Sequence, residues 1–270
     1  MVTDKLVVGN WKMHLNIEQA SLLVHRLDEK IALHRGVEVV LAPSYISLQP
    51  AHRAIDHRKF KLASQDGYFV DEGSYTGAVS FTMLRNLIDY AIIGHSERRR
   101  YFHESLEDVR SKVEAAVRNG IKPILCVGET RDERNQKETK SILHDQVVSA
   151  LSNLTDEEVA KMVIGYEPVW AIGGHQPAKP AEIEEALQWI RYQVRELYGQ
   201  SVADAIRLIY GGSDEPEFVD SIMKIAGVDG LLVGHASLNY AQMAAIIEGV
   251  AKAAHESIRH TSQSGGDDGR

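Results

Sequence analysis

Four short stretches of the chain carry the residue types needed to move protons on a small phosphorylated carbonyl compound. They are Gly-Asn-Trp-Lys at 9–12, Gly-His-Ser-Glu at 94–97, Tyr-Glu-Pro-Val-Trp at 166–170 and Tyr-Gly-Gly-Ser at 210–213. They supply a lysine, a histidine, a carboxylate and glycine-rich backbone, and proton transfer by such groups requires no cofactor. Each stretch follows a short apolar run typical of a strand. Because ligands bind at the carboxyl ends of parallel strands, the four stretches predict one site.

Glu167 is the leading candidate for a general base. It lies between an apolar run and Pro168, and the side chains of Val169 and Trp170 are expected to form an apolar wall beside its carboxylate. Desolvation raises the pKa of a carboxylate, and a base that removes a proton from carbon needs that basicity. The alternative interpretation is a glutamate at a strand end that pairs with a lysine.

His95 and Lys12 are the other candidates for direct chemistry. If Ser96 begins a short helix, the His95 ring lies at the positive end of that helix, which favours a neutral imidazole that donates a hydrogen bond. Lys12 follows Asn10 at the end of the first strand, where it would balance the charge of an anionic substrate. The alternatives are a buried or capping histidine and an ordinary surface lysine.

Glycine-rich segments after the last two predicted strands are candidates for phosphate binding. They are residues 211–213 (Gly-Gly-Ser) and the pair Gly234-His235. Backbone amides without bulky side chains, together with a helix start, can hold a phosphate group. A pair of glycines alone more often marks a simple turn.

The elements that position these residues alternate regularly along the chain. Eight runs are apolar or nearly so, as parallel strands covered on both faces tend to be. They are residues 5–8, 37–41, 59–63, 90–93, 121–127, 162–165, 207–210 and 230–233. Amphipathic stretches separate them, most clearly 180–198, with Pro180 suited to the helix start and Gly199 to its end. Gly227 is placed to end a helix that begins near Asp214.

Eight strands, each followed by a helical stretch, predict an α/β protein with a closed eight-fold β/α barrel. An open doubly wound sheet is the alternative, although it would normally have fewer strands. Residues 1–255 are expected to form a single barrel domain, since no linker composition divides them. Residues 256–270 are expected to be a disordered tail because they offer little to bury.

Composition narrows the functional class. A net charge of −8 argues against nucleic acid as a main partner, and no apolar run reaches the length of about 18 residues that a membrane span needs. The single cysteine, Cys126, excludes an internal disulfide, is expected to be buried, and favours a cytoplasmic location. Twelve histidines raise the possibility of a metal site, but no metal-binding spacing is present. The charged segment 131–140 resembles a solvated helix face.

From residue 5 to 250, the chain resembles the triosephosphate isomerase family. The matching stretches are Gly-Asn-Trp-Lys at 9–12, Ile-Ile-Gly-His-Ser-Glu-Arg-Arg at 92–99, Cys-Val-Gly-Glu-Thr at 126–130, Tyr-Glu-Pro-Val-Trp-Ala-Ile-Gly at 166–173, Tyr-Gly-Gly-Ser at 210–213 and Leu-Val-Gly at 232–234. The resemblance implies a single-domain (β/α)8 TIM barrel. It also implies interconversion of dihydroxyacetone phosphate and D-glyceraldehyde 3-phosphate in glycolysis and gluconeogenesis, without cofactor or metal.

The resemblance also implies a role for each site residue. This family is a standard example of a glutamate base working with a neutral histidine, so these roles are carried over from it. Glu167 would move the proton between carbons, His95 would polarise the carbonyl, and Lys12 would stabilise the enediolate. Asn10 would orient Lys12 and the substrate, and Glu97 would support the site. The phosphate group would be held by Gly173, Ser213, Gly234 and His235, under a lid formed by residues 168–178.

Four departures from the family pattern lie outside Asn10, Lys12, His95 and Glu167. The family usually has Thr-Gly-Lys-Thr-Ala where this chain reads Gly-His-Gln-Pro-Ala at 174–178, and Gly-Gly where it reads Gly234-His235. The third loop, 65–79, usually carries Gln-Asn and Thr-Gly-Glu, but this chain has Gln-Asp at 65–66 and Thr-Gly-Ala at 76–78.

The third loop bears on assembly, since the resemblance implies a homodimer in which it inserts into the partner. The usual glutamate meets an arginine there. Ala78 cannot make that pair, so we expect Arg98 to lack its usual partner and the dimer to be weakened.

Two other functions are compatible with the same motifs. The altered lid and His235 leave room for an isomerase of a larger ketose phosphate, such as a tetrulose phosphate. A catalytically silent sugar-phosphate-binding protein is the alternative from another class. The retention of Lys12, His95 and Glu167 argues against it, because a pure binding protein needs no base.

Overall fold

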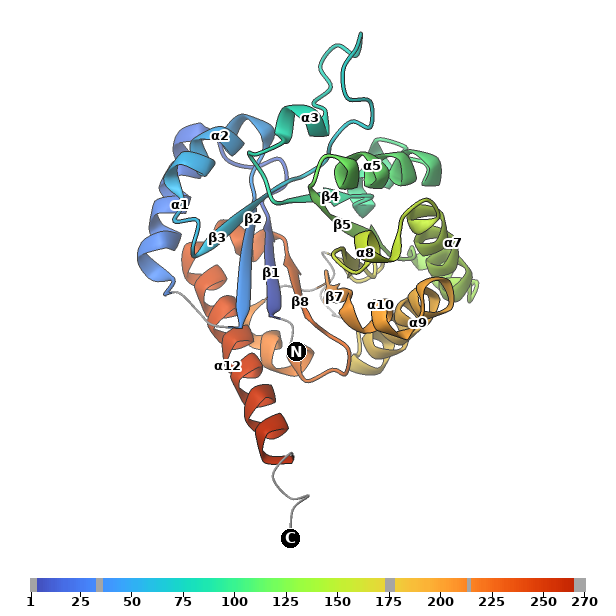
Figure 1. The fold of residues 1–270 in the computed structure, drawn as a ribbon. Coiled ribbons are helices and arrows are strands. Elements are labelled where there is room, and N and C mark those ends of the chain that lie inside the picture. Colours follow the sequence, from blue (N-terminus) through green and yellow to red (C-terminus); the bar gives the residue numbers. More distant parts are fainter. Residues whose placement is uncertain (1–3, 33–35, 173–177, 213–214, 265–270) are drawn as a thin grey trace.

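The structure is a computed structural model that describes residues 4–32, 36–172, 178–212 and 215–264, with side chains described as far as Glu256. Eight parallel strands follow one another in chain order and close into a barrel (Figure 1), and β1 pairs with β8 to complete it. The strands are β1 (Lys5–Asn10), β2 (Val37–Ala42), β3 (Phe60–Ser64), β4 (Tyr90–Ile93), β5 (Lys122–Val127), β6 (Val163–Tyr166), β7 (Arg207–Tyr210) and β8 (Gly230–Val233). The predicted barrel is confirmed.

Helices surround the barrel and cover the outer face of its sheet (Figure 1). They are α1 (Ile17–Lys30), α2 (Tyr45–Ala54), α3 (Phe81–Leu84), α4 (Ser96–Tyr101), α5 (Leu106–Arg118), α6 (Arg131–Asn135), α7 (Thr139–Leu151), α8 (Asp156–Val159), α9 (Pro180–Tyr198), α10 (Gln200–Ala205), α11 (Val219–Met223) and α12 (Tyr240–Ser264), with 3-10 turns η1 (Pro216–Phe218) and η2 (His235–Leu238). The α9 bounds agree with the prediction, and Gly199 ends that helix with a φ of 83°, which glycine adopts readily.

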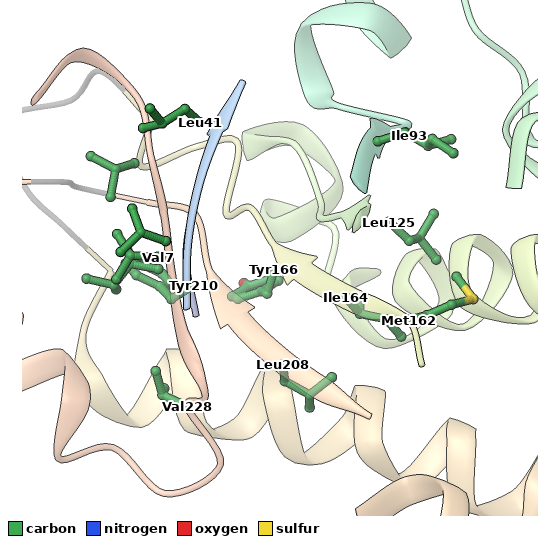
Figure 2. Close-up of a cluster of buried hydrophobic side chains, with 14 of the residues drawn as sticks. Val7, Leu41, Ile93, Leu125, Met162, Ile164, Tyr166, Leu208, Tyr210 and Val228 are labelled. Atoms are coloured by element: carbon green, nitrogen blue, oxygen red, sulfur yellow. The ribbon is translucent and has the colours of Figure 1, made fainter. Parts of the chain in front are cut away.

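Alternating side chains on the strands build two separate apolar cores. Along β1, Val7 packs outward against the helices, whereas Leu6 and Val8 fill the barrel interior. Figure 2 shows the outer core, in which Leu41, Ile164 and other strand residues contact the helical layer. Both faces of each strand are therefore buried, which explains why the strands read as continuous apolar runs. The inner core includes Cys126, which is buried as predicted.

Two predicted boundaries differ from the structure. The helix expected to continue to Gly227 ends at Met223, and Gly227 lies beyond it with a φ of 85°. The predicted boundary between the barrel and its tail, at residues 255 and 256, falls inside α12, which continues to Ser264. Extending an existing helix needs no new nucleation, so polar residues can follow the apolar ones within it. Residues 265–270 lie outside the described part of the chain, and the division into barrel and tail stays a prediction.

Candidate active site

The end of β1 places Asn10 and Lys12 at the mouth of the barrel. Leu6 and Val8 face the interior, and the two-residue period brings the buried side chain of Asn10 to the same face. The amide oxygen of Asn10 accepts a hydrogen bond of 3.1 Å from the backbone N–H of Lys12. Lys12 has a φ of 51°, a conformation that costs energy for a residue with a Cβ. Its Nζ lies 2.7 Å from Oε1 of Glu97.

His95 is the N-cap of α4, so Ser96 begins a short helix as predicted. Its Nδ1 accepts a hydrogen bond of 3.2 Å from the backbone N–H of Glu97. A nitrogen that accepts a hydrogen bond carries no proton, so this geometry assigns the ring proton to Nε2 and makes the imidazole neutral. Only 8% of the ring is exposed, and Oε2 of Glu97 lies 3.6 Å from Nδ1.

Glu167 follows β6 and is almost completely buried, with 1% of the residue exposed. Its Oε1 lies 2.9 Å from Nε2 of His95, and its Oε2 accepts a hydrogen bond of 3.0 Å from the backbone N–H of Ser96. Burial by itself raises the pKa of the carboxyl. The interactions with His95, Arg99 and the Ser96 amide outweigh burial and lower the pKa of Glu167 below its usual value. The carboxylate is thus ionised and fully engaged in this arrangement.

A continuous series of contacts links five of the predicted site residues. Asn10 contacts Lys12, Lys12 contacts Glu97, Glu97 contacts His95, and His95 contacts Glu167. These residues come from the ends of β1, β4 and β6. The structure therefore brings together at one mouth of the barrel a carboxylate, an imidazole and an ammonium group.

Gly211 was expected only in a phosphate loop, but it also borders the candidate base. A Cβ placed on Gly211 would lie 3.1 Å from Cγ of Glu167, so a glycine leaves room for the side chain. The sequence signal was the two-residue period of β7, which directs residues 209 and 211 to the interior. Ser213 and Gly173, both predicted to bind phosphate, lie outside the described residues.

Glu129 is a buried carboxylate for which the sequence indicated no role, although it stands in one of the family-like motifs. It is 0% exposed, and it accepts hydrogen bonds from the Trp170 indole at 2.9 Å and from the Tyr166 hydroxyl at 3.2 Å. Trp170, expected to form a wall beside Glu167, is thus bound to Glu129. Arg134 lies 3.2 Å from Glu129 and 2.6 Å from Glu182.

The segment 131–140 is therefore more than a solvated helix face. It forms α6 and the start of α7, and its Arg134 neutralises a fully buried group. Periodicity shows which residues of a helix face solvent, but it does not show which distant residue a charged side chain contacts. The contact between Arg134 and Glu129 is therefore visible only in the fold.

The last predicted phosphate loop is compatible with the substitution of histidine for glycine. Gly234 follows β8, and His235 begins η2 with an exposed side chain. The residues with positive φ among those described do not include His235. The Cβ of His235 therefore adds no left-handed strain.

Loop 65–79 projects from the barrel next to α3 (Figure 1). With alanine at 78, Arg98 was expected to need another partner, and the structure supplies two. Arg98 lies 3.0 Å from Asp66 and also pairs with Glu104 in its own chain. The aspartate at 66 replaces the neutral residue usual in the family, so it supplies the missing negative charge from a different position of the same loop.

Two further findings concern the described residues alone. Within the ranges given above, no three or more histidine, cysteine, aspartate or glutamate side chains gather closely enough to hold a metal ion. In the same part of the chain, no helix combines the length and apolar character required to cross a membrane.

Comparisons with known proteins identify the family. A profile described as "Triosephosphate isomerase" matches residues 5–250. The chain is 42% identical over 243 residues to the triosephosphate isomerase of Clostridium tetani, covering 90% of this chain and 95% of that protein. The corresponding protein of Carboxydothermus hydrogenoformans is 39% identical over 244 residues, covering 90% and 97% of the two chains. With this match and the barrel-mouth geometry together, the chain belongs to the triosephosphate isomerase family.

Proposed function

We propose that this triosephosphate isomerase interconverts dihydroxyacetone phosphate and D-glyceraldehyde 3-phosphate with Glu167 as the base and His95 as the neutral acid. The Glu167 carboxylate removes a proton from C1 of dihydroxyacetone phosphate, and the electron pair moves to give an enediolate. Nε2 of His95 donates its proton to the oxygen on C2, and the ring then recovers a proton from the oxygen on C1. Protonated Glu167 returns its proton to C2, so no proton is gained or lost overall.

The observation that carries this proposal is the contact between Nε2 of His95 and Oε1 of Glu167 at 2.9 Å, combined with the bond accepted by Nδ1 of His95. A neutral imidazole donates to a developing oxyanion and can give up a proton and regain it. In the arrangement described, both oxygens of Glu167 are occupied, which makes it a weak base. Substrate must draw the carboxylate away from the Ser96 amide. Burial without those contacts then raises its basicity.

Lys12, Asn10 and Glu97 complete the proposed machinery. The ammonium group of Lys12 would stabilise the negative charge that develops on the enediolate oxygens. Asn10 holds the backbone of Lys12, and Glu97 holds its side chain through the contact of 2.7 Å. Glu97 also fixes the His95 tautomer through its backbone N–H. We assign it a supporting role because it contacts both groups rather than the reacting atoms.

Phosphate binding is proposed for the backbone amides of Gly234 and His235, together with Gly173 and Ser213. Gly234 and His235 follow β8 at the same end of the barrel as Glu167, and this position supports their part in the proposal. Backbone N–H groups at that position suit a dianion. Closure of a lid formed by residues 168–178 would exclude water and protect the enediolate from loss of phosphate.

A coupled assay of glyceraldehyde 3-phosphate isomerisation tests the function. We expect rapid turnover by the parent, and a loss of about 100-fold for Glu167→Asp because it withdraws the carboxylate by about 1 Å. Faster turnover of a tetrulose phosphate than of the triose phosphates would instead favour a larger ketose as substrate. Binding of a phosphate-bearing inhibitor without turnover of either substrate would identify a silent binding protein.

We further propose that the enzyme is a cytoplasmic homodimer built around loop 65–79. Large apolar side chains are exposed in the segments that follow the first four strands: Met13 is 95% exposed, and Ile46, Tyr75, Met83, Tyr101 and Phe102 are also exposed. A cavity of about 370 Å³ lies beside the loop and is lined by Ala78, Arg98, Phe102 and neighbouring residues. An exposed apolar surface of this kind is typical of an interface. The single cysteine, buried and free, fits the cytoplasm.

The dimer is expected to be weaker than usual for the family because Ala78 contributes no charge to the partner and Arg98 is already paired within its own chain. Sedimentation over a dilution series checks this expectation. Dissociation in the nanomolar range would support it, whereas a dimer intact at nanomolar protein would contradict the weakening. A stable and fully active monomer would contradict the dimer itself.

A further inference from the structure

Gln146, on α7, makes a two-point contact with the backbone of Gly128. Its amide oxygen accepts a hydrogen bond of 2.7 Å from the N–H of Gly128, and its amide nitrogen donates one of 3.2 Å to the carbonyl of the same residue. The paired bonds fix both the position and the orientation of the Gly128 peptide groups. The side chain of Gln146 is half-buried, so these bonds are partly shielded from water.

Gly128 in turn lies directly against the backbone of Glu167. A Cβ on Gly128 would lie 1.8 Å from the carbonyl oxygen of Glu167, which no side chain could tolerate. Hydrogen bonds flank this contact on both sides: the N–H of Glu167 donates to Val127 at 2.7 Å, and the N–H of Val169 donates to Glu129 at 3.2 Å. The backbone of Glu167 is therefore held against the segment 127–129.

Arg99 joins this arrangement to the His95 strand. Its guanidinium donates to the carbonyl of Gly128 at 3.2 Å and to that of Cys126 at 2.7 Å, and it also bonds the carbonyl of Gly94, the residue before His95. Arg99 thus ties the ends of β4 and β5 together. Gln146 holds the same Gly128 from α7, in the helical layer.

We infer that Gln146 is a positioning residue for the base Glu167, acting through the peptide groups of Gly128. This inference rests on the proposed role of Glu167. A base that removes a proton from carbon must be placed to within about 1 Å, and an error of that size can cost about 100-fold in rate. Gln146 supplies part of that placement from a helix outside the barrel.

Gln146→Met tests the inference because it keeps the length of the side chain and removes both hydrogen bonds. Gln193→Met is the matched control. Gln193 is more deeply buried than Gln146, and its side chain bonds His144 of α7 at 2.7 Å rather than the backbone that holds Glu167. We expect Gln146→Met to lower kcat roughly 10- to 100-fold with KM changed by less than about twofold. Gln193→Met should lose comparable thermal stability and keep the kcat of the parent.

A pH profile provides a readout that a general loosening of the fold would not move. Contacts with the Ser96 amide and His95 help to keep Glu167 ionised, so displacing its backbone should raise the pKa of the carboxyl. The acidic limb of kcat/KM, which reports ionisation of the free enzyme, should then move to higher pH in Gln146→Met but not in Gln193→Met. The ionisation of the substrate phosphate affects the pH profiles of both variants equally, so it cancels when the two profiles are compared.

Gln146→Asn serves as a second variant if the methionine variant does not fold, since its amide is one methylene too short to reach Gly128. We expect it to reproduce the loss of kcat. The inference is overturned if the folded Gln146 variants match Gln193→Met in both kcat and pH profile. The activity of the unmodified protein is measured first. If the unmodified protein does not isomerise triose phosphates, the proposed function is overturned rather than the inference about Gln146.

Discussion

Each end of the barrel holds a carboxylate, partly buried at one end and fully buried at the other, and the partners of the two carboxylates differ in kind. At the amino ends of the strands, Glu38 accepts hydrogen bonds of 2.8 Å from both the Arg207 guanidinium and the Tyr90 hydroxyl. At the carboxyl ends, Glu167 contacts the neutral ring of His95 and the backbone amide of Ser96. Burial raises the pKa of both groups, and in both the partners outweigh burial and lower it.

The difference between these partners is what we expect to separate a structural carboxylate, Glu38, from the proposed catalytic one, Glu167. Arg207 carries a permanent charge and also donates to Tyr90 at 2.7 Å, so Glu38 is locked in a closed triad. His95 can exchange protons, and a backbone amide can be exchanged for other contacts at moderate cost. A lowered pKa in a buried carboxyl therefore does not identify a base. We propose that the base is the carboxylate whose partners can be released or can transfer a proton.

Replacing Glu167 and Glu38, each by glutamine, should give the largest difference in kcat between the two ends of the barrel. We expect Glu167→Gln to lower kcat by about three orders of magnitude, because a general base contributes on that scale. Binding of a phosphate-bearing inhibitor should remain close to that of the parent. Glu38→Gln should keep kcat within about twofold. Steady-state kinetics of the two variants checks this contrast, and near-normal turnover by Glu167→Gln would remove the proposed mechanism.

Removal of the fixed cation should produce the converse pattern at the amino end. Arg207→Met leaves Glu38 without its cation in a largely buried position, so we expect the free energy of unfolding to fall by about 2–3 kcal/mol. The kcat of the folded fraction should be unchanged. Urea unfolding measures the loss, with Arg58→Met, which breaks an exposed pair with Asp56, as a control expected to change little. If Arg207→Met lost no more unfolding free energy than Arg58→Met, the triad would stabilise the fold no more than an exposed ion pair does.

The pH dependence of stability sharpens the same comparison. The pKa of Glu38 is lower in the folded than in the unfolded state, so its ionised form stabilises the fold. That contribution is fully present above the unfolded value of about 4.5 and is lost as the pH falls through the folded value. Unfolding free energies measured from pH 7 to 3 should therefore converge for the parent and Glu38→Gln below about pH 4.5. Parallel curves would mean that the triad does not stabilise the ionised carboxylate.

The smallest effect is expected at the rim of the carboxyl end. The His235 side chain is exposed and its backbone is unstrained, so His235→Gly should change the affinity for a phosphate-bearing inhibitor by less than about twofold from pH 6 to 8. Isothermal titration of both proteins at each pH cancels the ionisation of the phosphate itself. A gain in affinity for the parent alone as the pH falls toward 6 would indicate that an imidazolium assists binding.

Much of this architecture could be predicted because burial on both strand faces leaves an unambiguous apolar run. The bounds 90–93, 207–210 and 230–233 agree with β4, β7 and β8. The candidate site residues were found for the same reason, since each follows such a run. Their contacts to one another, including the contact between His95 and Glu167, depend on the closure of the barrel and lie beyond what spacing can reveal.

The features that the sequence did not reveal depend on contacts between distant segments. Arg134 has the local appearance of a solvated helix residue, but it neutralises Glu129 beneath Trp170. Arg98 was expected to lack its usual partner because of Ala78, but which residue replaces that partner could not be predicted: Asp66, at another position of loop 65–79, supplies the charge.

A neutral His95 beside an ionised Glu167 is the arrangement on which the proposed mechanism depends. Nitrogen-15 NMR of imidazole-labelled protein at pH 7.5, with the His95 signals assigned by comparison with His95→Gln, tests it most directly. We predict one protonated nitrogen, Nε2, and one unprotonated nitrogen, Nδ1, as the hydrogen bond from Glu97 requires. Protons on both nitrogens, or a proton on Nδ1 alone, would contradict the neutral donor and with it the difference between the two ends of the barrel.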